Sequence, residues 1–190
     1  MKKILCVLLL LFTGCSSKTS MIEIQKHVYV EKEFKDSWLE TNEFGDSYIK
    51  EELQGGYHYH FDQQFLEIFF NTGGKIELYN YSIKKNDLII SGEMIPPKTI
   101  RLVHPHLDNV TSEGVIIHEL GHYFDEKHQF SSSKQFTKLY KKYRTLFNQK
   151  TKKEYFAECF KEYVGGHQEK VKPFHSYMKI ITQKIRQKNK

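Results

Sequence analysis

His118 and His122 lie four positions apart in the run VIIHELGHYF, residues 115–124. Residues four apart on an α-helix share a face, so the two imidazoles can bind one zinc ion together. Glu119 is rotated by about 100° from His118 around such a helix. Its carboxylate can therefore reach a water beside the zinc rather than the zinc itself. The spacing predicts hydrolytic chemistry, provided that a third ligand comes from elsewhere in the chain.

The residues around this motif are apolar and compatible with a helix. Thr111, Ser112 and Glu113 precede it and offer side chains that could cap the helix N-terminus. The simpler interpretation is a core helix whose two histidines are satisfied by hydrogen bonds, with no metal. The apolar, helix-forming neighbourhood favours the metal-binding interpretation.

A third ligand is predicted from the run KEYFAECF, residues 153–160, which carries Glu154 and Glu158 at helical spacing. One carboxylate can bind zinc while the other hydrogen-bonds a ligand histidine and fixes its tautomer. The residues alone leave open which glutamate has which role. Thr151 and Glu154 also fit a capping box, in which Glu154 would serve only the helix N-terminus. Capping alone does not explain the second carboxylate one turn later.

The two runs, HELGHYFD at 118–125 and EYFAECFKEY at 154–163, together resemble the catalytic domain of anthrax lethal factor. They are also similar to the related Pro-Pro endopeptidases that Gram-positive bacteria secrete. The likeness extends over roughly residues 60–185 and includes a terminal helix after Pro173. In that family the first glutamate of the second run is the third zinc ligand, and the next supports a histidine. The resemblance implies that Glu154 is the ligand and Glu158 the supporting residue.

One position departs from that family. Its members carry a tyrosine seven residues before the ligand glutamate, where the hydroxyl stabilises the oxyanion, whereas this chain has Phe147. Tyr143, one helical turn earlier, is the candidate substitute. Asp125 is a candidate hydrogen-bond partner near the histidines, although a solvent-facing role fits its position equally well.

The composition suits a folded protein. The 190 residues include 39% hydrophobic and 14% aromatic residues, enough for one domain with a sizeable core. The net charge of +6 fits a solvated face or an affinity for an anionic envelope surface. We find no nucleic-acid motif and expect no nucleic-acid partner.

The first residues predict export. Met1-Lys2-Lys3 and an apolar run to Phe12 form a segment too short to span a membrane but typical of a signal peptide. Small residues before Cys15 resemble a bacterial lipobox, which predicts residues 1–14 as a lipoprotein signal peptide and Cys15 as the lipidated residue. We expect a tether at 15–21, a single domain at 22–190, and a protein anchored outside the cytoplasm on the cell membrane. Phe12 stands where a lipobox usually has leucine, so a plain secretory signal is the alternative.

The cysteines agree with this scheme. Cys6 leaves with the leader and Cys15 receives lipid, so Cys159 is left alone and no intramolecular disulfide is expected. We expect Cys159 to behave as a small buried hydrophobic residue rather than as a nucleophile.

The elements that position these residues predict an α+β fold of the zincin type. A small mixed sheet would precede the helix with the histidines, and the C-terminal half would be all helical. The strand at 99–103 is expected to be an edge that pairs with a substrate backbone. His58, His60, His104 and His106 are expected to lie in exposed or loop positions rather than to bind metal. The predicted strands are 28–30, 57–61, 75–79 and 99–103, a loop is predicted at 92–97, and the predicted helices are 62–70, 133–147, 152–164 and 172–186.

These expectations combine into a zinc-dependent endopeptidase of the gluzincin type that acts on extracellular proteins, most simply as a monomer. The alternative is a catalytically inactive surface lipoprotein that binds zinc and acts through contacts. Glu119 favours the enzyme, because a purely structural zinc site needs no general base.

Overall fold

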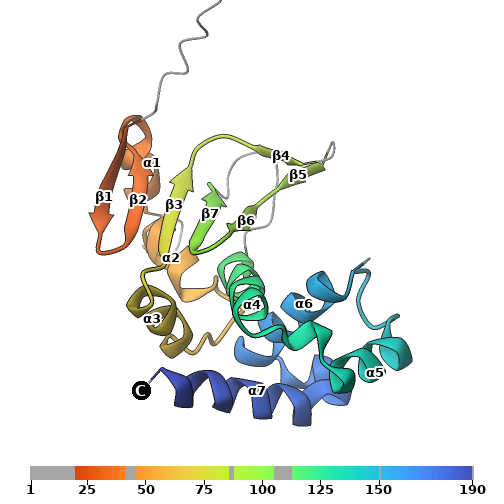
Figure 1. The fold of residues 1–190 in the computed structure, drawn as a ribbon. Helices are drawn as coiled ribbons and strands as arrows, with labels where there is room; N and C mark the ends of the chain where they lie inside the picture. The colour runs from red at the N-terminus through yellow and green to blue at the C-terminus, as the bar shows by residue number, and fades with distance from the viewer. Residues whose placement is uncertain (1–19, 42–45, 86–87, 105–112, 150, 190) are drawn as a thin grey trace, which may run out of the picture.

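The computed structural model describes residues 20–41, 46–85, 88–104, 113–149 and 151–189. A five-stranded mixed sheet forms one side of the molecule, in the order β1-β2-β3-β7-β6 (Figure 1). β2, β3 and β7 are parallel, and antiparallel β1 and β6 form the two edges. The bounds are Met21–Gln25 for β1, Val28–Glu31 for β2, Lys75–Tyr79 for β3, Gly92–Ile95 for β6 and Thr99–Val103 for β7.

Alternating side chains give the sheet one apolar face. In β3 and β7, Ile76, Leu78, Ile100 and Leu102 are almost fully buried, whereas Glu77 and its cross-strand neighbour Arg101 lie on the other face. This period-two pattern lets the first half of the chain bury one face against helices. The strands predicted at 28–30, 75–79 and 99–103 are confirmed.

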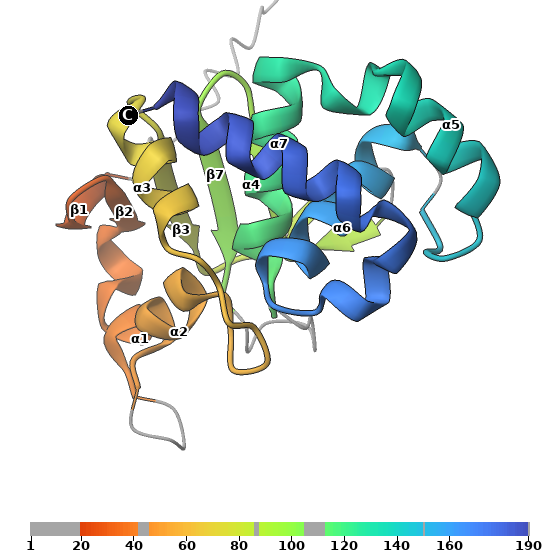
Figure 2. The ribbon, with the colours of Figure 1, turned by 90° about the horizontal axis from the view of Figure 1, so that it is seen from below.

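Helices cover the apolar face and continue into a helical second half (Figure 2). A two-stranded hairpin of β4, Ile83–Lys85, and β5, Leu88–Ile90, leads into β6. The α-helices are α1 Lys35–Leu39, α2 Tyr48–Gln54, α3 Gln64–Asn71, α4 Val115–His128, α5 Lys134–Tyr143, α6 Lys152–Val164 and α7 His175–Lys188. The 3-10 turns are η1 Lys32–Phe34, η2 Phe130–Ser132 and η3 Gln168–Phe174.

Aromatic rings join the two halves. The ring of Phe160 in α6 lies 5.4 Å from that of Phe65 in α3 and 5.6 Å from that of Phe124 in α4, and all three side chains are fully buried. Such edge and tilted contacts are favourable beyond the area that they bury. They hold α4 and α6, the two helices that carry the predicted zinc ligands, in one core.

Several sequence predictions are wrong. Residues 57–61 form a turn at Tyr57 and His58 followed by irregular backbone rather than a strand, because long-range contacts fix them: the amide of His60 donates to the Gly165 carbonyl. The loop predicted at 92–97 begins with β6, which pairs with β7. β7 is therefore an inner strand, and the edge that we expected at 99–103 is β6 instead. The helix predicted at 133–147 ends at Tyr143.

The α+β class and the mixed sheet are confirmed, as is the helical second half. The predicted leader, the predicted lipidation site Cys15 and His106 lie outside the described residues. Within the described ranges, no helix has the length and apolar character needed to cross a membrane.

Candidate metal centre

The two histidines project from α4 toward α6. α4 begins after Gly114, whose left-handed backbone (φ 71°) turns the chain into the helix without a side-chain cap. Glycine adopts this conformation without the cost that other residues incur. The prediction that Glu113 caps α4 is therefore wrong, and Thr111 and Ser112 lie outside the described residues. Glu113 instead pairs with His58 at 2.6 Å on the surface.

Glu154 reaches the histidines from the first turn of α6. Thr151 caps that helix, since its hydroxyl oxygen accepts the Glu154 amide at 3.2 Å. The threonine half of the predicted capping box is thus present. The Glu154 carboxylate nevertheless turns toward α4, where one oxygen lies 3.3 Å from His118 Nε2 and 3.2 Å from His122 Nε2.

Three potential ligand atoms form a nearly equilateral triangle. The Nε2 atoms of His118 and His122 are 3.2 Å apart, and both are about equally distant from the Glu154 oxygen. Zinc bonds of about 2.0–2.1 Å in a tetrahedron would separate neighbouring ligand atoms by about 3.3 Å. The donor set and its spacing therefore fit zinc, and these three residues form the one such cluster within the described ranges.

Glu158 holds the other side of His118. Its carboxylate lies 3.2 Å from His118 Nδ1, which leaves Nε2 directed at the cluster. Burial alone would lower the pKa of His118, but hydrogen bonds to Glu154 and Glu158 outweigh it and raise the pKa to about 9. Hydrogen bonds to the two histidines hold the pKa of Glu154 well below its usual range. The structure thus brings together His118, His122, Glu154 and Glu158, the four residues that the sequence grouped.

Glu119 lies on the sheet side of α4, beside the cluster. Its side chain is 6% exposed, and burial raises the pKa of its carboxyl despite the two nearby histidines. The backbone amide of Met94 in β6 donates a hydrogen bond to this carboxylate. A buried carboxylate with a raised pKa, fixed by a backbone amide, suits a group that must accept a proton near neutral pH.

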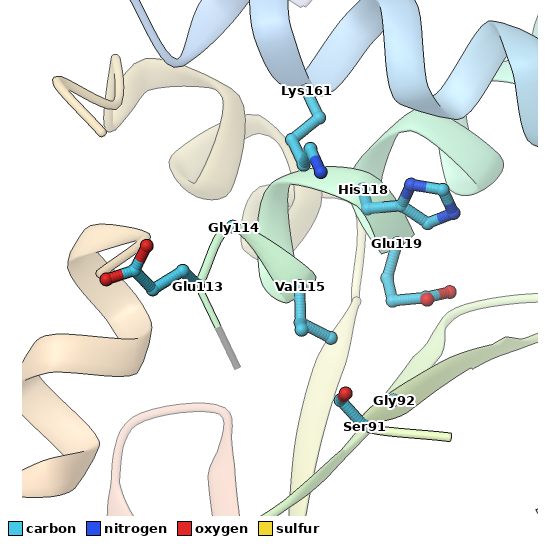
Figure 3. Close-up of a pocket in the computed structure, with 8 residues that line it drawn as sticks. All are labelled: Ser91, Gly92, Glu113, Gly114, Val115, His118, Glu119 and Lys161. Atoms are coloured by element: carbon cyan, nitrogen blue, oxygen red, sulfur yellow. The ribbon is translucent and has the colours of Figure 1, made fainter. Parts of the chain in front are cut away.

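A groove of about 240 Å³ opens next to His118 and Glu119 (Figure 3). Gly92 of β6 and Val115 of α4 line one side of it, and Lys161 of α6 enters from the other. A Cβ on Gly92 would stand 2.6 Å from a Val115 methyl, so the strand approaches α4 this closely only with glycine there. The remaining lining residues are Ser91, Glu113 and Gly114.

Lys161 is the main site residue that the sequence analysis missed. Its amine lies 2.7 Å from Glu158 and 3.7 Å from buried Glu162. Tyr59 donates a hydrogen bond to Glu162 at 3.0 Å. The sequence did indicate this contact, because Lys161 follows Glu158 by three positions and therefore lies on the same face of the helix.

The remaining candidates lie elsewhere. Both carboxylate oxygens of Asp125 accept hydrogen bonds from Ser131, at 2.6 and 2.7 Å, so this buried residue fixes the turn after α4. Tyr143 is the last residue of α5, and its ring packs on that of Phe174, with the two centroids 6.1 Å apart. Phe147 packs on Tyr155 at 5.3 Å. The structure brings neither Asp125 nor Tyr143 to the cluster.

Two further expectations concern histidine and cysteine. Buried His104 lies against the Ser37 carbonyl at 3.1 Å, and Cys159 is a free, fully buried thiol whose pKa is raised by burial. Cys159 is thus a core residue, as predicted.

No family model matches the chain, and no curated protein matches its sequence. We therefore infer the function from the geometry of the site.

Proposed function

We propose that the protein is a zinc-dependent endopeptidase of the gluzincin type with a zincin-like fold. The supporting observation is the triangle of nitrogen and oxygen atoms from His118, His122 and Glu154 beside a buried carboxylate. These three residues would hold the ion, and Glu158 would orient His118. Bound zinc polarises a peptide carbonyl and lowers the pKa of water toward about 7.

Glu119 would carry the proton. Its raised pKa lets the carboxylate accept a proton from the attacking water and deliver it to the amine that leaves. The Met94 amide keeps the carboxylate on the sheet side of α4 during this transfer. A structural zinc site would have no use for a buried carboxylate held in this way.

The edge strand β6 offers a place for the peptide backbone. The Val103 amide donates to the Ser91 carbonyl at 2.8 Å, and Glu93 lies opposite Arg101. Because hydrogen-bonded pairs alternate along an antiparallel ladder, the backbone groups of Gly92 and Met94 point away from β7. Since the Met94 amide is held by Glu119, an extended substrate could add to this edge through Gly92 and the Met94 carbonyl and pass its own carbonyl in front of Glu119.

The cellular setting is part of the same proposal. The predicted signal peptide and Cys15 favour a protein that is lipid-anchored outside the cytoplasm and cleaves extracellular proteins, with secretion as the alternative. A monomer is the simplest form of such an enzyme. The resemblance to the lethal factor catalytic domain supports the same reaction. The absence of a tyrosine at position 147 is the point at which the chain departs from that family.

Peptide cleavage is the direct test. Purified wild-type protein and Glu119→Ala would be incubated with a fluorogenic peptide library, with and without chelator, and zinc would be measured in both proteins. We expect chelator-sensitive cleavage by the wild type, none by the variant, and equal zinc content. Undiminished hydrolysis by Glu119→Ala would refute the general-base role.

A second candidate function is a zinc-binding surface protein without catalysis. Phe147 lacks a hydroxyl and the partly buried Tyr143 ring packs on Phe174, so neither takes the place of the tyrosine that stabilises the oxyanion in the family that the chain resembles. Zinc-loaded wild-type protein that cleaves no peptide in the library would favour this candidate.

A further inference from the structure

Charge is divided unequally along the chain. Residues 1–126 contain 12 lysines and arginines against 19 aspartates and glutamates, whereas residues 127–190 contain 17 against four. Of those four acids, Glu154 and Glu158 contact the histidines of the cluster, and Glu162 pairs with His167 and Lys170. The surface of the helical half is therefore strongly basic, which favours a partner of opposite charge.

The basic character is concentrated around α5. Between Glu126 and Glu154 the sequence has nine lysines and arginines and no acidic residue. Lys134, Lys138 and Lys141 share one face of α5, since they are spaced by four and three positions. With Ser132 and Thr137 they line a groove of about 370 Å³.

The three lysines are available to a ligand. All are exposed, and in the part of the chain that the structure describes none forms an ion pair. By contrast, nearby Lys153 pairs with Glu126 at 3.4 Å. Like charges within a Debye length of about 8 Å repel one another, so a bound anion relieves repulsion among the three ammonium groups.

The groove and the metal cluster both lie beside the first turn of α6. The Lys152 amine donates to the Thr137 hydroxyl at 3.2 Å, and Lys152 stands two residues before Glu154 on α6. Lys152 and Glu154 lie about 200° apart around α6, so the groove is on the other side of the first turn of this helix from the predicted zinc ligand. An extended peptide advances about 3.3 Å per residue, so residues roughly four to six positions from the cleaved bond could reach the groove.

We propose that the groove formed by Ser132, Lys134, Thr137, Lys138 and Lys141 binds an acidic segment of the protein substrate, close in sequence to the cleaved bond. This inference rests on the proposed peptidase function and names its substrate class. Lysines beside two hydroxyl groups can hold aspartate and glutamate side chains by charge-assisted hydrogen bonds.

A lipid surface fits the position less well. α5 lies at the end of the helical half farthest from β1, in both views (Figure 1, Figure 2). A lipid on Cys15 would be six residues from Met21, a span of at most about 20 Å. Such an anchor would keep β1 near the membrane and direct α5 away from it, toward soluble partners.

Binding can be measured without catalysis. The probe would be a fluorescent peptide rich in aspartate and glutamate, and its isosteric asparagine and glutamine version would be the comparison. Each would be titrated by anisotropy against full-length Glu119→Ala, which is not expected to cleave it. The test variant adds Lys134→Glu, Lys138→Glu and Lys141→Glu, and the control adds Lys172→Glu, Lys179→Glu and Lys188→Glu on the exposed surface of η3 and α7.

We expect the acidic peptide to bind at least about tenfold more weakly to the α5 variant than to the α7 control, with the difference shrinking as salt rises. The amide peptide should not distinguish them. Equal binding to the two triple variants would overturn the inference, as would preference for anionic vesicles or DNA over the acidic peptide.

Cleavage separates this inference from the function on which it rests. In the wild-type background, the α5 variant should lose about tenfold in kcat/KM on peptides with an acidic segment and retain its rate on uncharged ones. Equal losses on both peptides would overturn the groove and leave the peptidase intact. Acidic-peptide binding without chelator-sensitive cleavage of any peptide would overturn the peptidase instead.

Discussion

Gly121 of α4 lies directly against Ala157 of α6: a Cβ on Gly121 would stand 2.9 Å from the Ala157 Cα and 3.2 Å from its carbonyl oxygen. This contact sets the separation of the two helices at the level of the histidines and glutamates of the candidate metal centre. His118 and His122 flank Gly121, and Glu154 and Glu158 flank Ala157. The approach of two small residues therefore fixes the distance over which imidazoles and carboxylates meet.

Gly121→Ala is expected to lower both stability and zinc affinity. Alanine normally stabilises a helix relative to glycine by about 1 kcal/mol, but the added methyl here meets backbone that cannot rotate away. We expect a net loss of about 1–2 kcal/mol in the free energy of unfolding. Urea unfolding without zinc measures the loss of stability, and the additional stability gained in the presence of zinc reports the zinc affinity. Ala157→Gly should not rescue the variant, because the obstacle is the backbone; a Gly121→Ala protein as stable as wild type would contradict this account of the packing.

Glu158→Gln is expected to weaken zinc binding by about 10–100-fold, the usual effect of losing a carboxylate that orients a ligand histidine. The uncharged side-chain amide of glutamine cannot replace the carboxylate that contacts His118 Nδ1 and forms the ion pair with the Lys161 amine. Competition with a chromogenic chelator measures the affinity. Glu169→Gln, on the exposed surface of η3, is the matched control and should bind zinc as the wild type does. Identical affinities for the two variants would show that Glu158 has no supporting role.

Tyr143→Phe is expected to leave kcat/KM within about twofold of wild type, because the Tyr143 ring packs on Phe174 rather than beside the zinc ligands. Phe147→Tyr, which adds the hydroxyl found in the resembling family, should raise kcat by about tenfold or more if an oxyanion donor is missing. Steady-state kinetics on one cleaved peptide compares both. A large loss in Tyr143→Phe would assign the oxyanion role to Tyr143 after all.

Glu77 is expected to make stability depend on pH on the acid side. Although burial raises its pKa, hydrogen bonds from Lys75, Tyr79 and Arg101 lower the pKa below the usual value. A lowered folded-state pKa stabilises the protein above the unfolded value of about 4.3, and this contribution is lost as pH falls through the folded value. Glu77→Gln should therefore be less stable by about 1 kcal/mol at pH 7. The difference should shrink toward zero below about pH 4; a difference independent of pH would contradict the charge effect.

The helices that carry the predicted ligands and three of the strands, β2, β3 and β7, followed from local patterns. The four-residue spacing of His118 and His122 and of Glu154 and Glu158 predicted which side chains share a face, and alternating residues predicted β3 and β7. Glu154 was preferred over Glu158 through the family resemblance, and the structure places its oxygen between the two Nε2 atoms.

The errors arose where contacts distant in sequence decide the local structure. Tyr57–Phe61 alternates like a strand, yet Tyr59 packs so tightly on Gly165 that a Cβ there would stand 2.2 Å from its ring. Gly92 in β6 and Pro96 just after it are residues typical of a loop, and the sequence alone therefore predicted a loop here. The segment is a strand because it pairs with β7. The groove beside Glu119 depends on β6 and was therefore not predictable before the fold was known.

The zinc content of the purified protein tests the central claim most directly. After equilibration against nanomolar free zinc, metal analysis would compare wild type, Glu119→Ala, His122→Ala and Glu154→Ala. We predict about one zinc per chain in the first two proteins and little in the last two, since each of those lacks one of three protein ligands. A wild type without stoichiometric zinc, or a Glu154→Ala variant that retains it fully, would contradict the account.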